Sequence, residues 1–447
     1  MRSVRRHLPG GVTVRVCRSV FVLLVMLAAT SVILAQGAGP GAVVTLAVAG
    51  RSNSAPWIAA HGRDVAVTWA PASGGKSDVF VAMSTDAGAT FTAPVQVNMV
   101  PGEGRVGGEI PPRVALRGRA GTTPEVVVAW NAKDHGTEIK IARSGDGGRT
   151  FGAPSSLQSP GAAGDRGWHS LTVDDQGVAH VLWLDHRGLS GPKTEHTHGA
   201  ARDEIDGVAM AQKSSLYYAS FGASVSTERA VTSGVCYCCK SAIVALPGGT
   251  LVSAWRHVYA GNMRDMAFTM SRDGGASFAP PARVSADGWS INGCPDDGPA
   301  LAAGPDERVH IVWPTVIPGT EPVGALFYST LGASGTFAPR TCIPTLGSPK
   351  PSHPQVVVDG SGRMVVAWDE SLGGVRTAAY SVAERAADGA VRFGPAARFA
   401  AEGPTLYPVM AGLADGVVAA WTAGAPGSQV IQVRQLVAAG RTLVERR

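Results

Sequence analysis

A phrase of eight residues recurs along this chain of 447 residues, and it constrains the fold more than any other feature. It reads S-T-D-A-G-A-T-F at 84–91, S-G-D-G-G-R-T-F at 144–151 and S-R-D-G-G-A-S-F at 271–278, with a degenerate copy at 329–337. In each complete copy a short Asp carboxylate can accept hydrogen bonds from N–H groups of a turn, and glycines permit positive φ. The repeats therefore predict hairpins of one design, in which three aspartates have a structural role. These are Asp86, Asp146 and Asp273.

A second repeat runs alongside the first and defines larger units. Seven short apolar segments end in tryptophan at intervals of 53 to 72 residues, and each follows another short apolar segment. A variable loop, a third apolar segment and the eight-residue phrase or its remnant complete the unit. Four antiparallel strands of this length form a propeller blade, so the sequence predicts an all-β propeller. Seven blades are favoured, and six is the alternative if the first and last units share strands. We expect the tryptophans to fill the space between neighbouring blades.

The N-terminus has the order of residues typical of a secretory signal. Five arginines precede an apolar run from Val20 to Ala35. Cleavage near Ala35 is favoured, and an uncleaved membrane anchor is the alternative, because the run is long. The predicted organisation is a signal at 1–35, a linker at 36–49 and one propeller domain at 50–447. The protein is then secreted, periplasmic or on the cell surface.

The net charge of +5 comes from the same N-terminal segment. Its five arginines are not balanced by any acidic residue, so the remainder of the chain is close to neutral. The basic charge is therefore no argument for nucleic-acid binding. We expect a monomer that meets a membrane only through the N-terminal segment, if that segment is retained.

Propeller topology sorts the loops into two faces. The eight-residue phrases connect the third and fourth strands of a blade, so they lie opposite the loops that join the second and third strands. Those loops, and the crossings between blades, are rich in charged and aromatic residues and should converge on the axial funnel. Substrate-binding candidates on these loops and crossings are Glu109, His169, His257 and His353.

Five cysteines follow the N-terminal segment, and all belong to adjacent connections on the loop-rich face. They are Cys236, Cys238, Cys239, Cys294 and Cys342. One or two disulfides between these connections are the favoured interpretation. A metal site of thiolates and nearby histidines is one alternative, and it would favour copper(I) or zinc. A vicinal Cys238–Cys239 bridge or a redox role is the other. No other cofactor is implied.

The eight-residue phrase resembles the Asp-box, or bacterial neuraminidase repeat, of the sialidase-like propeller superfamily, and the likeness covers the chain from about residue 50 to its end. That resemblance implies three arginines that clamp a sugar carboxylate, a Tyr–Glu nucleophile pair and an Asp acid/base. The family's Arg before Ile-Pro is missing here, and the cysteine-rich crossing is foreign to sialidases. The stand-ins chosen by placement are Arg187, Arg256, Arg264, Asp185, Asp265, Asp297 and Tyr407.

The sequence therefore favours an exported sialidase-like propeller that acts on a glycan or glycoconjugate, with exo-glycosidase activity of the sialidase type as the enzymatic form. Two alternatives stay open. One is a propeller that binds a glycan or a protein without cleaving it. The other is a copper or zinc protein that uses the cysteine cluster.

Overall fold

The computed structural model describes residues 41–118, 122–133, 136–189, 207–291, 293, 295–385, 390–438 and 441–442. The predicted signal and residues 36–40 of the predicted linker lie outside these residues, as does Cys294. In the part of the chain that is described, no helix is long and apolar enough to cross a membrane.

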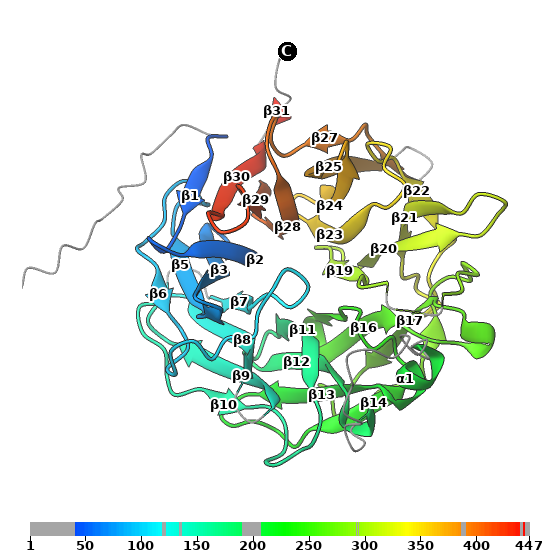
Figure 1. Cartoon of the computed structure of the whole chain (residues 1–447), viewed down its shortest axis with the longest axis horizontal. Coiled ribbons are helices and arrows are strands. Elements are labelled where there is room, and N and C mark those ends of the chain that lie inside the picture. Colours follow the sequence, from blue (N-terminus) through cyan, green and yellow to red (C-terminus); the bar gives the residue numbers. More distant parts are fainter. Residues whose placement is uncertain are drawn as a thin grey trace, which may run out of the picture. The chain divides into compact units, whose positions relative to one another are not determined.

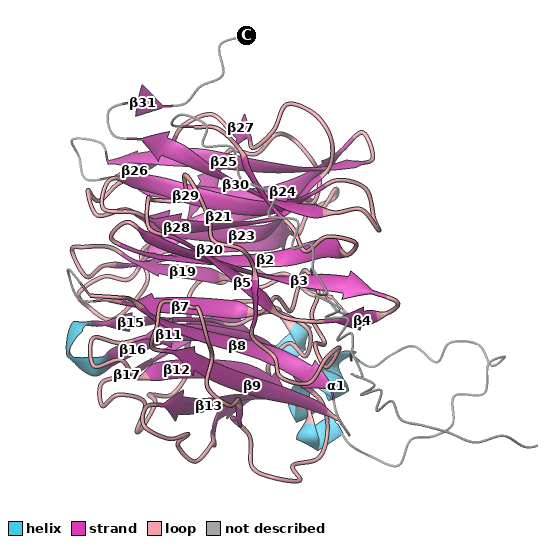
Figure 2. Ribbon diagram, turned by 90° about the vertical axis from the view of Figure 1, so that its left-hand side faces the viewer, coloured by secondary structure: helices cyan, strands magenta, loops and turns pink. Residues whose placement is uncertain are grey.

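Seven antiparallel sheets are arranged in a ring around a central axis (Figure 1). The innermost strands contact one another in sequence around the ring, and the first of them also contacts the last. The prediction of a seven-bladed propeller is therefore confirmed. Seen from the side, the strands of the blades cross the molecule in layers, and helix is sparse (Figure 2).

The first three blades each run from the axis outward in chain order. Blade 1 consists of β2 (Ser52–His61), β3 (Asp64–Ser73), β5 (Phe80–Ser84) and β6 (Val95–Gln96), with β4 (Lys76–Ser77) paired to β3. Blade 2 consists of β7 (Arg113–Arg117), β8 (Glu125–Lys133), β9 (Thr137–Ser144) and β10 (Ser155–Ser156). Blade 3 consists of β11 (Arg166–Val173), β12 (Ala179–Asp185), β13 (Ser215–Phe221) and β14 (Arg229–Ser233).

The next three blades follow the same order. Blade 4 consists of β15 (Ala242–Leu246), β16 (Thr250–Arg256), β17 (Met266–Ser271) and β18 (Ala282–Arg283). Blade 5 consists of β19 (Ala300–Ala303), β20 (Val309–Ile317), β21 (Val323–Thr330) and β22 (Thr341–Ile343). Blade 6 consists of β23 (Ser352–Val358), β24 (Met364–Leu372), β25 (Val375–Arg385) and β26 (Val391–Phe393), with β27 (Ala397–Arg398) also paired to β25. Short helices are α1 (Gly207–Lys213), η1 (Arg187–Leu189), η2 (Pro247–Gly249) and η3 (Ala260–Asn262).

The seventh blade combines both ends of the described chain. It contains β28 (Thr405–Gly412), β29 (Gly416–Ala423) and β30 (Val430–Ala438), and its outer strand is β1 (Val44–Leu46), which pairs with β30. The short β31 (Arg441–Thr442) also pairs with β30. The first and last units thus do share a sheet, but the ring still has seven blades, because β1 is an extra strand that precedes the first complete unit.

The tryptophans of the second strands lie between blades, as predicted. All seven are fully buried. Trp130 of blade 2, for example, packs with Val79 and Val81 of blade 1, and Trp421 of blade 7 packs with Val365 of blade 6. The large indole supplies apolar area at each wedge-shaped interface, which stabilises the ring without a continuous central core.

The eight-residue phrases form hairpin turns between the third and fourth strands. In the second phrase, the Asp146 carboxylate accepts hydrogen bonds from the Ser144 and Thr150 hydroxyls at 2.7 and 2.6 Å and from the Thr150 N–H at 3.0 Å. Gly147 and Gly148 have positive φ of 74° and 78°. Asp86 and Asp273 make the equivalent bonds in their turns.

Candidate functional site

Five innermost strands are preceded or begun by a non-glycine residue with left-handed backbone. These residues are Ala55, Trp168, Asp296, His353 and Tyr407, with φ between 49° and 56°. The strand register shifts at four of these positions, in β2, β11, β23 and β28. Such a bulge turns a side chain away from the pleat of the sheet. The left-handed backbone conformation costs about 1–3 kcal/mol of folding free energy per residue. This strained conformation recurs at the same end of the inner strands. We call this end of the propeller axis the axial mouth.

His353 occupies the centre of the charged residues at the axial mouth. Its Nε2 lies 2.5 Å from Glu109 Oε1, and its Nδ1 lies 2.7 Å from Asp369 Oδ1. Burial disfavours a charged imidazole, but the neighbouring carboxylates of Asp369 and Glu109 outweigh it and raise the pKa of His353 to about 10. His353 is therefore an imidazolium at neutral pH, with a carboxylate on each ring nitrogen.

Tyr407 lies against His353, with ring centroids 4.4 Å apart. Its backbone N–H donates to Asp369 Oδ2 at 2.8 Å. Gly108 fits flat against the phenol ring, because a β-carbon at this position would lie 2.1 Å from the ring. Burial, together with the charges of Glu109 and Asp369, raises the pKa of Tyr407 to about 12. The phenol is thus neutral at physiological pH and can donate a proton or a hydrogen bond.

Two buried cations line the same pocket as Glu109, His353 and Tyr407. Lys240 Nζ donates to the Pro354 carbonyl at 3.1 Å, and burial lowers its pKa. The Arg113 guanidinium stacks on Trp57 at 3.5 Å from the ring centroid. Within the described residues, neither cation forms an ion pair. Buried cations without a contacting carboxylate favour an anionic ligand.

Adjacent aspartates on the crossing into blade 5 complete the axial mouth. Asp297 is buried, and its Oδ2 accepts the His353 backbone N–H at 2.8 Å. Asp296 is exposed as a residue, but its carboxyl group is partly shielded from solvent. This shielding, and to a smaller extent the negative charge of Glu109, raise the pKa of Asp296. Asp296 can therefore hold a proton more readily than an ordinary aspartate.

The three predicted clamp arginines do not line the pocket of Glu109, His353 and Tyr407, and their side chains bond to other groups. Arg256 is buried and donates to the carbonyls of Asp297, Arg264 and Pro314. Arg264 is also buried and donates to Asn262. Arg187 forms ion pairs with Asp185 and Glu228. These contacts favour a structural role for the three side chains.

Other residues that the sequence suggested for the site also make structural contacts. Asp185 pairs with Arg166 and Arg187. Asp265 is buried and accepts backbone N–H groups of Asp287 and Gly288. His169 is buried between blades, with its ring nitrogens held by Asn131 and Ala129, and burial lowers its pKa to about 3. His257 contacts Trp255 and Tyr259. Of the predicted residues, the axial mouth brings together Glu109, Asp297, His353 and Tyr407.

The candidates chosen from the sequence do not include five residues of the axial mouth, Arg113 among them. Lys240 lies on a crossing of the kind expected to be functional, Asp369 lies within β24, and Asp296 is next to the selected Asp297. Arg376, which pairs with Asp369 at 2.5 Å, lies near the start of β25 and has no sequence signal. The useful signal was X-Pro at the start of inner strands, since both His353 and Tyr407 precede proline.

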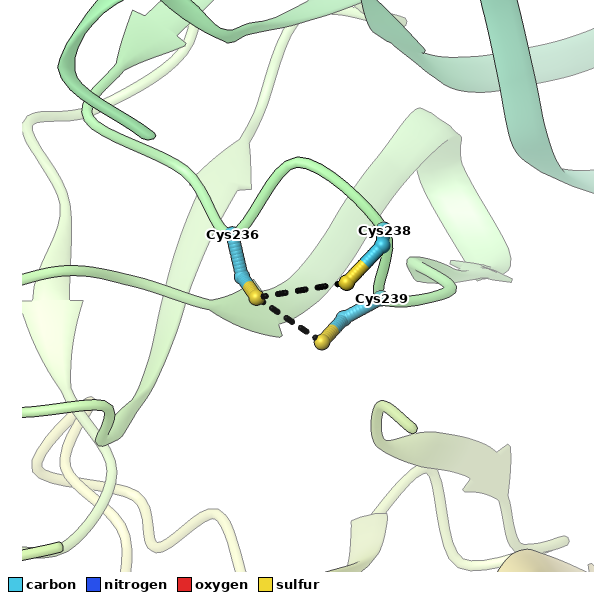
Figure 3. Close-up of side chains that lie close together, drawn as sticks. All are labelled: Cys236, Cys238 and Cys239. Carbon is cyan, nitrogen blue, oxygen red and sulfur yellow. Dashed lines mark hydrogen bonds between the residues drawn. The ribbon is translucent and has the colours of Figure 1, made fainter. Parts of the chain in front are cut away.

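The cysteine cluster lies on the crossing between β14 and β15. The sulfurs of Cys236, Cys238 and Cys239 lie within 4.8 Å of one another and are buried, a group that could hold a metal ion (Figure 3). Among the described residues the free thiols are Cys236, Cys239 and the exposed Cys342, and Cys238 is not one of them. Cys342 lies on β22, away from the three clustered sulfurs.

The chain matches no protein-family model and no curated protein sequence. Among solved structures it is similar to a PL25 ulvan lyase bound to an oligosaccharide (8% identity, 87% of this chain and 94% of that chain, TM-score 0.53). It is also similar to an α-L-arabinanase of Penicillium chrysogenum (12% identity, 89% and 98%, TM-score 0.45). A protein of unknown function from Dyadobacter fermentans is 15% identical over 74% of this chain and 94% of that chain, with a TM-score of 0.46. The likeness to the ulvan lyase, at 8% identity, shows the propeller fold alone. The two named enzymes act on glycans, but neither is a sialidase.

Proposed function

We propose that this chain is an exported propeller whose axial mouth binds and cleaves an acidic glycan. The observation that carries the proposal is the placement of Tyr407 and Glu109 beside two buried cations, Lys240 and Arg113, that lack a carboxylate partner in the described structure. A sugar carboxylate would supply the missing charge. Similar propellers that act on polysaccharides, such as the ulvan lyase, are consistent with this use of the fold.

The finer form of the proposal is an exo-glycosidase of the sialidase type. Tyr407 is the nucleophile, and Glu109 accepts its phenolic proton as the Tyr oxygen attacks the anomeric carbon. His353 orients Glu109 through the 2.5 Å contact. Asp296, whose pKa is raised, donates a proton to the departing oxygen. Water then cleaves the Tyr–sugar bond, with Asp296 as the base.

The proposal is tested with the full purified chain and a fluorogenic sialoside, together with a panel of uronic-acid and neutral glycosides. We expect product release from an acidic substrate, and weak or no release from neutral ones. Absence of release across the panel, with saturable binding on a glycan array, would overturn cleavage and leave a binding protein. Absence of both would overturn the glycan proposal altogether.

A further inference from the structure

Cys236 and Cys239 form a close thiol pair that the proposed glycan chemistry does not use. They are the first and last residues of the C-Y-C-C sequence at 236–239. The two Sγ atoms are 3.0 Å apart, and both residues are 1% exposed. Figure 3 shows the two side chains pointing toward each other from the two ends of a tight loop. This separation is about 1 Å longer than a disulfide bond, so the pair can close with a small shift of the loop.

The surroundings make the two sulfurs chemically unequal. Cys236 Sγ accepts hydrogen bonds from the Cys239 thiol and, at 3.5 Å, from Arg264 Nη1. The Cys239 bond and the charges of Arg256 and Arg264 outweigh burial, so the pKa of Cys236 falls to about 7. Burial and the neighbouring Cys236 raise the pKa of Cys239. Because the Arg264 guanidinium and the Cys239 thiol both point at Cys236 Sγ, a thiolate is stabilised there, which makes Cys236 the attacking and Cys239 the resolving cysteine.

We propose that Cys236 and Cys239 are a dithiol–disulfide site that reacts with low-molecular-weight disulfides. The Cys236 thiolate attacks one sulfur of the disulfide, an S–S bond forms, and one thiolate leaves. Cys239 then loses its proton and attacks Cys236 Sγ, which forms the Cys236–Cys239 bond and releases the second thiol. The protein loses two electrons and two protons, and the small disulfide is reduced to two thiols.

The pair directly borders the axial mouth. Lys240 follows Cys239 in the chain, and the Asp297 backbone N–H donates to the Cys239 sulfur. The Asp297 side chain in turn accepts the His353 N–H. Gly298 packs so tightly on this segment that a β-carbon would lie 2.0 Å from the Lys240 carbonyl oxygen. Oxidation of the pair therefore changes a hydrogen bond to a residue that holds His353.

The test uses the full chain equilibrated in buffers with graded ratios of reduced glutathione to glutathione disulfide. Remaining thiols are alkylated, and the linked peptides are identified by mass spectrometry. We expect a 236–239 linkage that forms reversibly and removes two alkylatable thiols. Cys239→Ser should instead trap glutathione on Cys236. Cys342→Ser, which removes an exposed thiol on β22, should leave the midpoint of the 236–239 linkage unchanged.

Two results would overturn the proposal. One is a wild-type protein in which Cys236 and Cys239 stay reduced at every ratio, while the exposed Cys342 becomes glutathionylated. The other is stoichiometric copper or zinc in the reduced protein, found by elemental analysis and protecting both thiols from alkylation. Neither measurement depends on a variant that folds or on a glycan substrate, so failure here is distinguishable from failure of the proposed function.

Discussion

The rings of His353 and Tyr407 lie 4.4 Å apart, although the two residues begin different inner strands. One buried carboxylate fixes both of them. Asp369 Oδ1 contacts His353 Nδ1 at 2.7 Å, and Asp369 Oδ2 accepts the Tyr407 N–H at 2.8 Å. These bonds help to offset the left-handed backbone of both residues, with φ of 55° and 51°. The strained backbone of His353 and Tyr407 is thus held in place by the buried carboxylate of Asp369.

Replacement of Tyr407 by Phe should separate chemistry from folding. The ring can still pack on His353 and Gly108, but the phenolic oxygen that we propose as nucleophile is lost. We expect turnover of an acidic glycoside to fall by about 10²-fold or more, with little change in the melting temperature. Tyr217→Phe is the matched control, since it removes a phenol from the ring that packs beside Trp183 in blade 3. Equal activity of both variants would remove Tyr407 from the mechanism.

Two neighbouring glycines test the fit of the tyrosine. A β-carbon at Gly108 would meet the Tyr407 ring at 2.1 Å, whereas one at Gly107 would meet no atom within 4 Å. Neither glycine has positive φ, so backbone strain does not confuse the comparison. We expect Gly108→Ala to displace Tyr407 and to lower kcat/KM by about tenfold or more, and Gly107→Ala to behave as wild type. The assay is steady-state turnover, with ligand binding as a second readout if no turnover is found.

The raised pKa of His353 predicts a loss of stability at alkaline pH. The folded-state pKa is about 10 and the ordinary value is 6.5, so this contribution is complete below about pH 6.5 and is lost as the pH rises toward 10. The full shift corresponds to at most about 5 kcal/mol of unfolding free energy. Groups that face the imidazole are Glu109, Asp297, Asp369, Arg376 and Tyr407.

Urea unfolding of wild type and His353→Gln at pH 6.5 and 9.5 measures this effect. The free energy of unfolding should fall more steeply with pH in wild type than in the variant, because the variant lacks the titrating ring. Parallel pH profiles would mean that the imidazole is not held between two carboxylates.

The repeats made the fold predictable, because each repeated residue has a local physical task. The aspartates of the eight-residue phrases satisfy the N–H groups of their own turns, and the tryptophans fill interfaces that recur in every blade. Such tasks leave a periodic trace in the sequence. The shared seventh blade was less evident, since β1 has only three residues and no repeated feature.

The axial mouth was predictable only in part. Topology directed attention to the right crossings, and Glu109, His353 and Tyr407 were selected there. Arg256 and Arg264 come from equally suitable loops, but they are buried against backbone carbonyls and a cysteine sulfur. Whether a loop arginine faces the axis or supports another loop depends on packing between distant segments. A single sequence carries no periodic trace of that packing.

Asp86 tests whether the hairpin turns of the eight-residue phrases have a structural role that is separate from the axial mouth. Its carboxylate accepts the Thr90 hydroxyl at 2.6 Å and the Ser84 hydroxyl at 2.7 Å, and these bonds outweigh partial burial and lower its pKa. Asp86→Ala should therefore lower the melting temperature by a few degrees while turnover and ligand affinity stay unchanged. Asp175→Ala, at an exposed aspartate in a turn of blade 3, should change neither. Loss of activity in a stably folded Asp86→Ala protein would contradict the assignment of these hairpins to the face opposite the axial mouth.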